Sequence, residues 1–122
     1  MKYIAKNDEL LNYLSGEKSL LDGSITRFDI FYADHKLNID VYITLLYSKD
    51  DKELKIQFQN ITQYGLFHTS DHHFYYIEQY KFFKSDKGFY VSFDPFEENS
   101  EIQSEDNDFI LADNIEGYFC NK

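Results

Sequence analysis

The sequence predicts an α+β protein: an antiparallel sheet of about six strands, curled or half-barrel in shape, with one short N-terminal helix. Three observations support this fold class. Apolar and polar residues alternate along most of the chain after Ser24, which is the two-residue period of half-buried strands. Short polar turns join the alternating segments, and neighbouring strands with short connections pair antiparallel. Helical spacing of apolar residues occurs near the N-terminus instead.

Length and composition predict one soluble domain that covers residues 1–122. Apolar residues make up 43% of the chain and aromatic residues 19%, which excludes a disordered composition. No apolar run reaches the roughly 18 residues that a membrane helix needs, and the charged start lacks a signal peptide's apolar region. The single cysteine, Cys120, fits a reducing compartment. We therefore expect a cytoplasmic protein.

The first expected element is a helix over about residues 7–15. Asn7 or Asp8 can cap its N-terminus, and Gly16 suits its exit. The apolar residues between them recur at helical spacing: Leu10, Leu11 and Leu14.

The strands are expected at about residues 24–33, 36–47, 53–64, 73–83, 88–94 and 108–119. The clearest alternation lies in 36–47, where an apolar residue recurs at every second position. In 53–64 the alternation breaks phase at Ile61, which indicates a bulge near Asn60. Aromatic residues on both faces of 73–83 are typical of a central strand covered on both sides, or of an exposed strip that binds a partner.

The charge of the chain is concentrated near its C-terminus. Residues 1–93 have a net charge of −2, whereas residues 94–122 have a net charge of −8. The segment 94–107 lacks alternation and is expected to be an acidic loop that faces water. A negative electrostatic field repels nucleic acid and anionic membranes and attracts cations. We therefore expect a basic protein partner, no nucleic acid and no membrane.

An interface on this loop would use carboxylates to steer a basic partner and an aromatic side chain to anchor it. The candidate partner-binding residues are Phe96, Glu97, Glu98, Glu101, Glu105, Asp106 and Asp108. The alternative is that the acidic loop serves only to keep the protein soluble.

The stretch FHTSDHHFYY (67–76) contains three of the four histidines of the chain. It offers three candidate metal ligands: His68, Asp71 and His72. Their spacing matches no zinc signature, and the residues between them favour a turn. If His72 and His73 begin a strand, their side chains leave on opposite faces and cannot share one ion. We interpret the stretch as a polar turn between the third and fourth strands, with a metal or small-ligand site at the mouth of a half-barrel as the alternative.

The chain contains no recognised catalytic motif. It has no G-x-S-x-G, no H-E-x-x-H and no glycine-rich phosphate loop. The acidic run EDND (105–108) continues into Ile110 and Leu111, where a calcium loop needs a polar residue and glycine. Cys120 has no neighbouring base that would activate it. We therefore expect a non-enzymatic protein without a cofactor.

The order of these features resembles a known group of proteins. The chain contains, in order, LLDGSITRFDIFYADHKLNIDVYITL (20–45), LKIQFQNIT (54–62), an aromatic segment, GFYVSFDPFEE (88–98) and DFILADNIEGYF (108–119). This order is similar to the small acidic β-rich immunity proteins of bacterial polymorphic-toxin and contact-dependent inhibition systems. The resemblance implies a binding protein that blocks a cognate toxin, often by masking a basic active-site groove. A third alternative is a homodimeric structural protein that pairs through an edge strand or an aromatic face.

Overall fold

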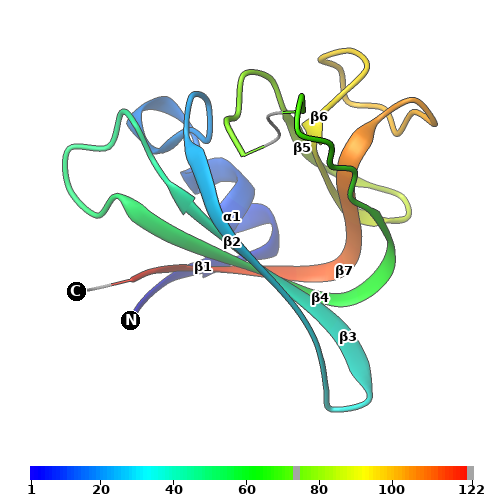
Figure 1. Ribbon diagram of the computed structural model, residues 1–122. Helices are drawn as coiled ribbons and strands as arrows, with labels where there is room; N and C mark the ends of the chain where they lie inside the picture. Colours follow the sequence, from blue (N-terminus) through cyan, green and yellow to red (C-terminus); the bar gives the residue numbers. More distant parts are fainter. Residues whose placement is uncertain (73–74, 121–122) are drawn as a thin grey trace.

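The computed structural model describes residues 1–72 and 75–120, and within these residues one antiparallel sheet of seven strands accompanies one short α-helix (Figure 1). The elements in chain order are β1 (Lys2–Lys6), α1 (Asn7–Tyr13), a 3-10 turn η1 (Gly16–Lys18), β2 (Ser24–Ala33), β3 (Lys36–Thr44), β4 (Glu53–Gly65), β5 (Lys81–Ser85), β6 (Gly88–Asp94) and β7 (Asn107–Phe119). The α+β class, with an antiparallel sheet and one short helix, is therefore confirmed, whereas the sheet has seven strands and not about six.

The strands follow the order β2-β3-β4-β7-β6-β5, and the sheet does not close into a barrel. β7 has three neighbouring strands, because it pairs with β4 along one edge and with β6 and then β1 along the other. The sheet bends around α1, and the β2–β3 hairpin extends beyond the body of the molecule (Figure 1). None of the helices in the described residues is both long and apolar enough to cross a membrane.

The bend occurs where β4 and β7 both change the face that they turn to the core. In β7, Ala112 before the bend and Ile115 after it both belong to the core cluster, so the alternation changes phase between them. In β4, Asn60 adopts a positive φ of 56°, and the register against β7 shifts between Ile61 and Gln63. The bulge expected near Asn60 is confirmed, and this phase change explains why exposed Asp113 interrupts the apolar pattern.

The core lies between the concave face of the sheet and α1. Inward residues of β3, β4 and β7 meet in cross-strand rows such as Ile39, Phe58 and Ile115, all of which are fully buried. Leu10 of α1 packs over Gly117, where even a Cβ atom would collide with the leucine side chain. A larger residue at position 117 would therefore displace Leu10 from its place over the sheet, which favours glycine.

Two expectations about the strands were wrong. β1 was not expected, because lysines at both of its ends obscure the alternation in KYIAK. The strand expected over 73–83 reduces to the edge strand β5, and residues 75–80 are irregular apart from one bridge between Ser24 and Tyr76. The start of that expected strand, His73 and Phe74, lies outside the described residues.

Candidate functional site

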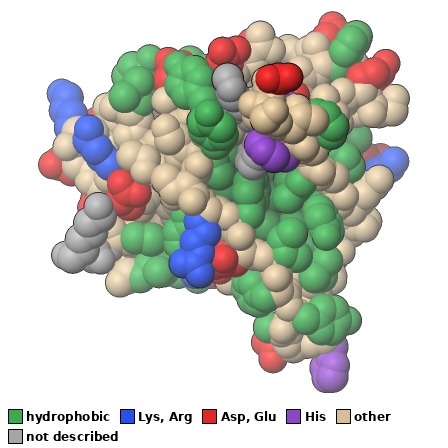
Figure 2. Space-filling view, viewed as in Figure 1, with side chains coloured by type: hydrophobic (Ala, Val, Ile, Leu, Met, Phe, Trp, Pro, Cys, Tyr) green, Lys and Arg blue, Asp and Glu red, His purple; other side chains and the backbone are tan. Residues whose placement is uncertain are grey.

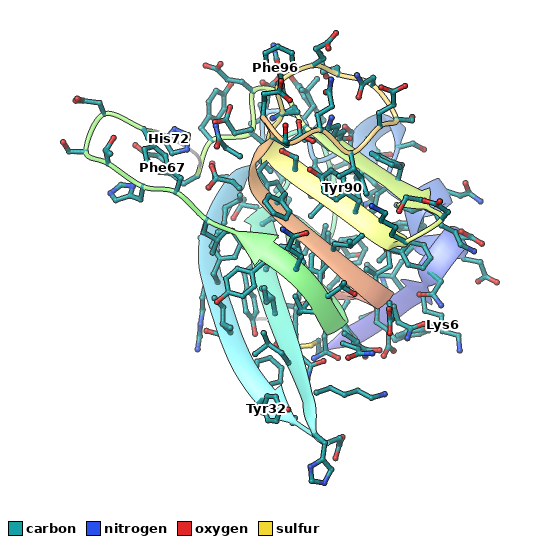
Figure 3. The ribbon with its side chains drawn as sticks, turned by 90° about the vertical axis from the view of Figure 1, so that its right-hand side faces the viewer. Lys6, Tyr32, Phe67, His72, Tyr90 and Phe96 are labelled. Carbon is teal, nitrogen blue, oxygen red and sulfur yellow. The ribbon has the colours of Figure 1, made fainter. Side chains whose placement is uncertain are left out.

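The acidic loop, residues 95–106, covers the outer face of β5, β6 and β7. Alternation along β6 sends Phe89, Val91 and Phe93 to the core and Tyr90 to the opposite face. Tyr90 packs there against Phe83 of β5 and Phe109 of β7, with ring centroids 5.5 and 5.9 Å away. Figure 3 shows Tyr90 on β6 and Phe96 on the loop above it. The loop is thus an ordered layer on the sheet.

A buried ion pair fixes this layer. The Lys81 Nζ lies 2.9 Å from Asp106 Oδ2, and the two side chains are only 3% and 0% exposed. The same ammonium group donates hydrogen bonds to three further acceptors in the loop: Asn99 Oδ1 (3.1 Å), the main-chain oxygen of Glu101 (2.6 Å) and Gln103 Oε1 (3.0 Å). Lys81 therefore ties the second half of the loop, from Asn99 to Asp106, to β5.

Asp106 is the acceptor at the centre of the same network. Its carboxylate receives hydrogen bonds from the Tyr90 hydroxyl (2.6 Å) and from the main-chain N–H groups of Phe96 (3.0 Å) and Gln103 (3.1 Å). Burial by itself raises the pKa of Asp106, but the bonds from Tyr90, Phe96, Lys81 and Gln103 together lower it below the ordinary value. Burial and the bond to Asp106 raise the pKa of Tyr90. The charged carboxylate is thus the stable form in the folded protein.

The outer surface of the loop is acidic and partly apolar. Phe96 is 59% exposed and Ile102 is 40% exposed. Four of the predicted steering residues are exposed around them: Glu97, Glu98, Glu101 and Glu105. These five candidate residues, including Phe96, lie on one ordered loop and are accessible to a partner.

Asp106 and Asp108 do not have the predicted surface role. Asp106 is buried because it serves as the internal acceptor for the loop. Asp108, near the start of β7, has a positive φ of 50° and a fully buried side chain. The expectation that the segment 94–107 faces water was therefore wrong for Asp106, and Asp108 is too deeply buried for the expected contact with a partner.

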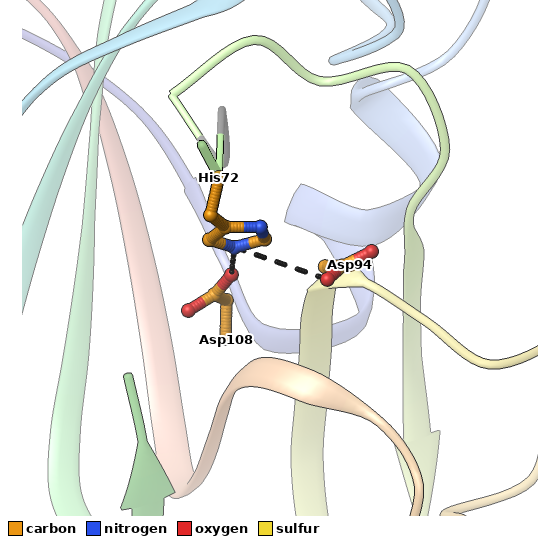
Figure 4. A group of neighbouring side chains, drawn as sticks. All are labelled: His72, Asp94 and Asp108. Carbon is orange, nitrogen blue, oxygen red and sulfur yellow. Dashed lines mark hydrogen bonds and ion pairs between the residues drawn. The ribbon is translucent and has the colours of Figure 1, made fainter. Parts of the chain in front are cut away.

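The histidine stretch contains the predicted turn, because the N–H of His72 donates to the main-chain oxygen of Thr69 (3.0 Å). His68 and Asp71 are exposed, whereas His72 is half-buried. The predicted ligand trio does not come together in the described residues, where His72 instead lies beside Asp94 and Asp108 (Figure 4). His73 lies outside the described residues.

The pairing of β6 with β7 brings the carboxylates of Asp94 and Asp108 together. Asp94 ends β6 and pairs in register with Asn107, the residue before Asp108. The Nε2 atom of His72 lies 2.7 Å from Asp108 Oδ2 and 3.8 Å from Asp94 Oδ2. The other oxygen of Asp108 accepts the main-chain N–H of Phe67 at 2.8 Å. A histidine beside two carboxylates can exchange a proton or bind a cation.

The site opens into a hollow of about 410 Å³. It is lined by His72, Tyr75, Tyr76, Glu78, Gln79, Phe93 and Asp94.

Beside the hollow, Tyr76 and Tyr47 both donate hydrogen bonds to Asp22. These bonds lower the pKa of Asp22 and raise the pKa of both tyrosines. Hydrophobic side chains gather on the same face, between the body and the β2–β3 hairpin (Figure 2). Ile30 and Tyr32 of that hairpin are exposed.

Sequence reasoning missed three residues of these two sites: Lys81, Tyr90 and Asp94. A lysine inside the aromatic run YKFF is the signal that marks Lys81, because a charge there needs a buried partner. Asp94 was read as part of the acidic loop, and its approach to His72 depends on the pairing of β6 with β7.

Comparisons with protein-family models, curated proteins and solved structures find no match to this chain.

Proposed function

We propose that the protein is a non-enzymatic binding protein that captures a basic protein partner through the acidic loop. The observation that supports this function is the buried Lys81–Asp106 pair, which fixes the loop while its glutamates remain exposed. A fixed loop loses little conformational entropy on binding, so more of the contact energy appears as affinity. The exposed carboxylates steer a cationic partner, and Phe96 and Ile102 supply apolar contacts.

The finer proposal is that the partner is a bacterial toxin domain and that the protein acts as its cytoplasmic immunity protein. It rests on the resemblance in feature order and on the match between an anionic surface and a basic toxin groove. Toxin and immunity protein are commonly encoded side by side, so the candidate partners are the products of neighbouring coding sequences. Protection of cells that express such a product, by co-expression of this chain, would support the proposal.

The test of the binding function compares two variants with equal net charge. The first replaces the four exposed loop glutamates by Gln: Glu97, Glu98, Glu101 and Glu105. The control neutralises four exposed acidic residues elsewhere: Glu9, Asp34, Asp50 and Asp71. Association rates with inactive neighbouring gene products are measured by stopped-flow fluorescence at low and at high salt.

We expect the loop variant to associate at least about tenfold more slowly at low salt and to lose most of its salt dependence. The control variant should resemble the unmodified protein, because its charges lie outside the loop. Equal rates for the two variants, or the absence of a basic protein among the partners that bind, would contradict the proposal. Replacing Phe96 by Ala should increase the dissociation rate with little effect on association.

A further inference from the structure

We propose that His72, Asp94 and Asp108 form a binding site for a divalent transition-metal ion such as Zn²⁺. This inference is independent of the acidic loop, because none of the three residues belongs to the loop's buried network. One ligand atom from each residue lies within 4.8 Å of the others. The three residues come from two strand ends and from the histidine turn, which the fold brings together (Figure 4).

The distances are close to those that an ion requires. Ligand atoms at about 2.0–2.2 Å from a zinc ion are separated from one another by roughly 3–3.5 Å. His72 Nε2 is 2.7 Å from Asp108 and 3.8 Å from Asp94, so the two separations lie on either side of that range. The Asp94 side chain is 43% exposed and has room to approach. Metal binding would therefore require the Asp94 side chain to move toward the other two ligands, and His72 and Asp108 to separate slightly.

The charge of the site favours a cation. The Asp108 side chain is fully buried, and Asp94 places a second carboxylate on the other side of the imidazole. Within residues 1–72 and 75–120, neither carboxylate forms an ion pair with a lysine or arginine. Asp106, the other buried carboxylate of this region, has Lys81 instead. Because a buried carboxylate is costly without a counter-charge, the arrangement suits a bound metal ion.

The chemistry of the donor set selects the class of ion. Imidazole nitrogen favours zinc and neighbouring transition metals, and two carboxylates complete a site of mixed N and O donors. Calcium favours six to eight oxygens, and magnesium retains most of its waters, so neither is the preferred occupant. The adjoining hollow gives water access to the remaining coordination positions. The N–H of Phe67 orients Asp108, as is common for ligating carboxylates.

A simpler arrangement competes with metal binding. Nε2 of His72 can carry a proton and donate it to Asp108, which would tie the histidine turn to β7 without any ion. A metal ion would displace that proton to solvent and leave the remaining proton on Nδ1. Asp94, at 3.8 Å, is too far to share the hydrogen bond. Without a metal ion, the Asp94 carboxylate has, among the described residues, only this long contact to His72 and a 3.5 Å hydrogen bond from Asn107 Nδ2, so its replacement should affect metal binding far more than the fold.

Isothermal titration of the chelator-treated full chain with ZnCl₂, MnCl₂ and CaCl₂ tests the proposal. We expect saturable one-to-one binding of Zn²⁺, tighter than that of Mn²⁺ and much tighter than that of Ca²⁺. Asp94→Asn should weaken Zn²⁺ binding at least about tenfold, while the thermal midpoint of the metal-free protein stays unchanged. The matched control is Asp71→Asn, in the exposed part of the same turn, which should bind as the unmodified protein does.

Two results would overturn the proposal. One is the absence of saturable Zn²⁺ binding. The other is unchanged binding by Asp94→Asn together with loss of binding by His68→Gln, which would assign the ion to exposed imidazoles of the turn. Co²⁺ provides a readout that does not depend on calorimetry, because its visible absorption reports nitrogen and oxygen coordination, and Asp94→Asn should change that spectrum.

Discussion

Two long connections of this molecule, the acidic loop and the histidine connection (residues 66–80), use buried carboxylates in different ways. In the acidic loop, Asp106 meets an ammonium group, a phenol and two main-chain N–H groups. Beside the histidine connection, Asp108 of β7 meets the main-chain N–H group of Phe67 and the imidazole of His72. The buried charge of the acidic loop is thus neutralised by Lys81, whereas in residues 1–72 and 75–120 no lysine or arginine pairs with Asp108. A buried charge without such neutralisation is suited to a ligand.

Removal of the Lys81 ammonium group should have the largest effect on the acidic loop. Lys81→Met leaves Asp106 buried without its counter-charge, so we expect the free energy of unfolding to fall by about 3–5 kcal/mol. Urea denaturation followed by tyrosine fluorescence measures the change. Lys87→Met, at an exposed position of the neighbouring turn, is the control and should change stability by less than about 0.5 kcal/mol.

A loss below about 1 kcal/mol in Lys81→Met would show that the ion pair does not hold the loop. The double variant Lys81→Met with Asp106→Leu sharpens the test. Because both charges are then absent, we expect it to recover part of the stability that the single variant loses.

The charge of Asp106 also predicts how stability depends on pH. Its hydrogen bonds give it a folded pKa below the unfolded value of about 3.9. The unfolded chain therefore binds a proton first, and this contribution to stability, present above that value, is lost as the pH falls through the folded pKa. Asp106→Asn should lower the free energy of unfolding by about 2–3 kcal/mol at pH 7, and the difference should shrink below pH 4. Urea unfolding at a series of pH values checks this, and a constant difference would contradict it.

Removing the histidine should have a smaller effect than removing the lysine. His72→Ala takes away the donor to Asp108, but the His72 side chain is 19% exposed, so water can replace part of the lost interaction. We expect a loss of about 1–2 kcal/mol in the metal-free protein, measured by urea denaturation. His35→Asn in the β2–β3 turn is a suitable control, because asparagine tolerates its positive φ of 62°. A loss as large as that of Lys81→Met would refute the proposed difference between the connections.

The smallest expected effect is that of the Tyr90 hydroxyl. Tyr90→Phe removes one of the donors to Asp106 and should cost about 1 kcal/mol at pH 7. Burial raises the pKa of Tyr90 above the unfolded value of about 10, so its contribution is present below that pH and is lost as the pH rises further. The variant should therefore lose less stability than the unmodified protein between neutral and alkaline pH. Parallel pH curves for the two proteins would contradict this.

The alternation of the sequence predicted the sheet better than it predicted the sites. β2 has its expected bounds, because each of its turns carries a clear polar signal. The segment 73–83 was misread, since aromatic residues on both faces suggested a central strand whereas β5 is at the edge. The burial of Lys81 and Asp106 depends on a loop that folds back over the sheet, and the pairing of Asp94 with His72 depends on the register of β6 and β7. Neither is a local property of the sequence.

Hydrogen exchange at two amides is the most direct test of whether Asp106 fixes the acidic loop. The N–H groups of Phe96 and Gln103 both donate to its carboxylate. Both amides should exchange at least about tenfold more slowly than their intrinsic rates, and Asp106→Asn should remove most of this protection. Exchange of both amides at intrinsic rates in the unmodified protein would show that Asp106 does not hold the loop in place.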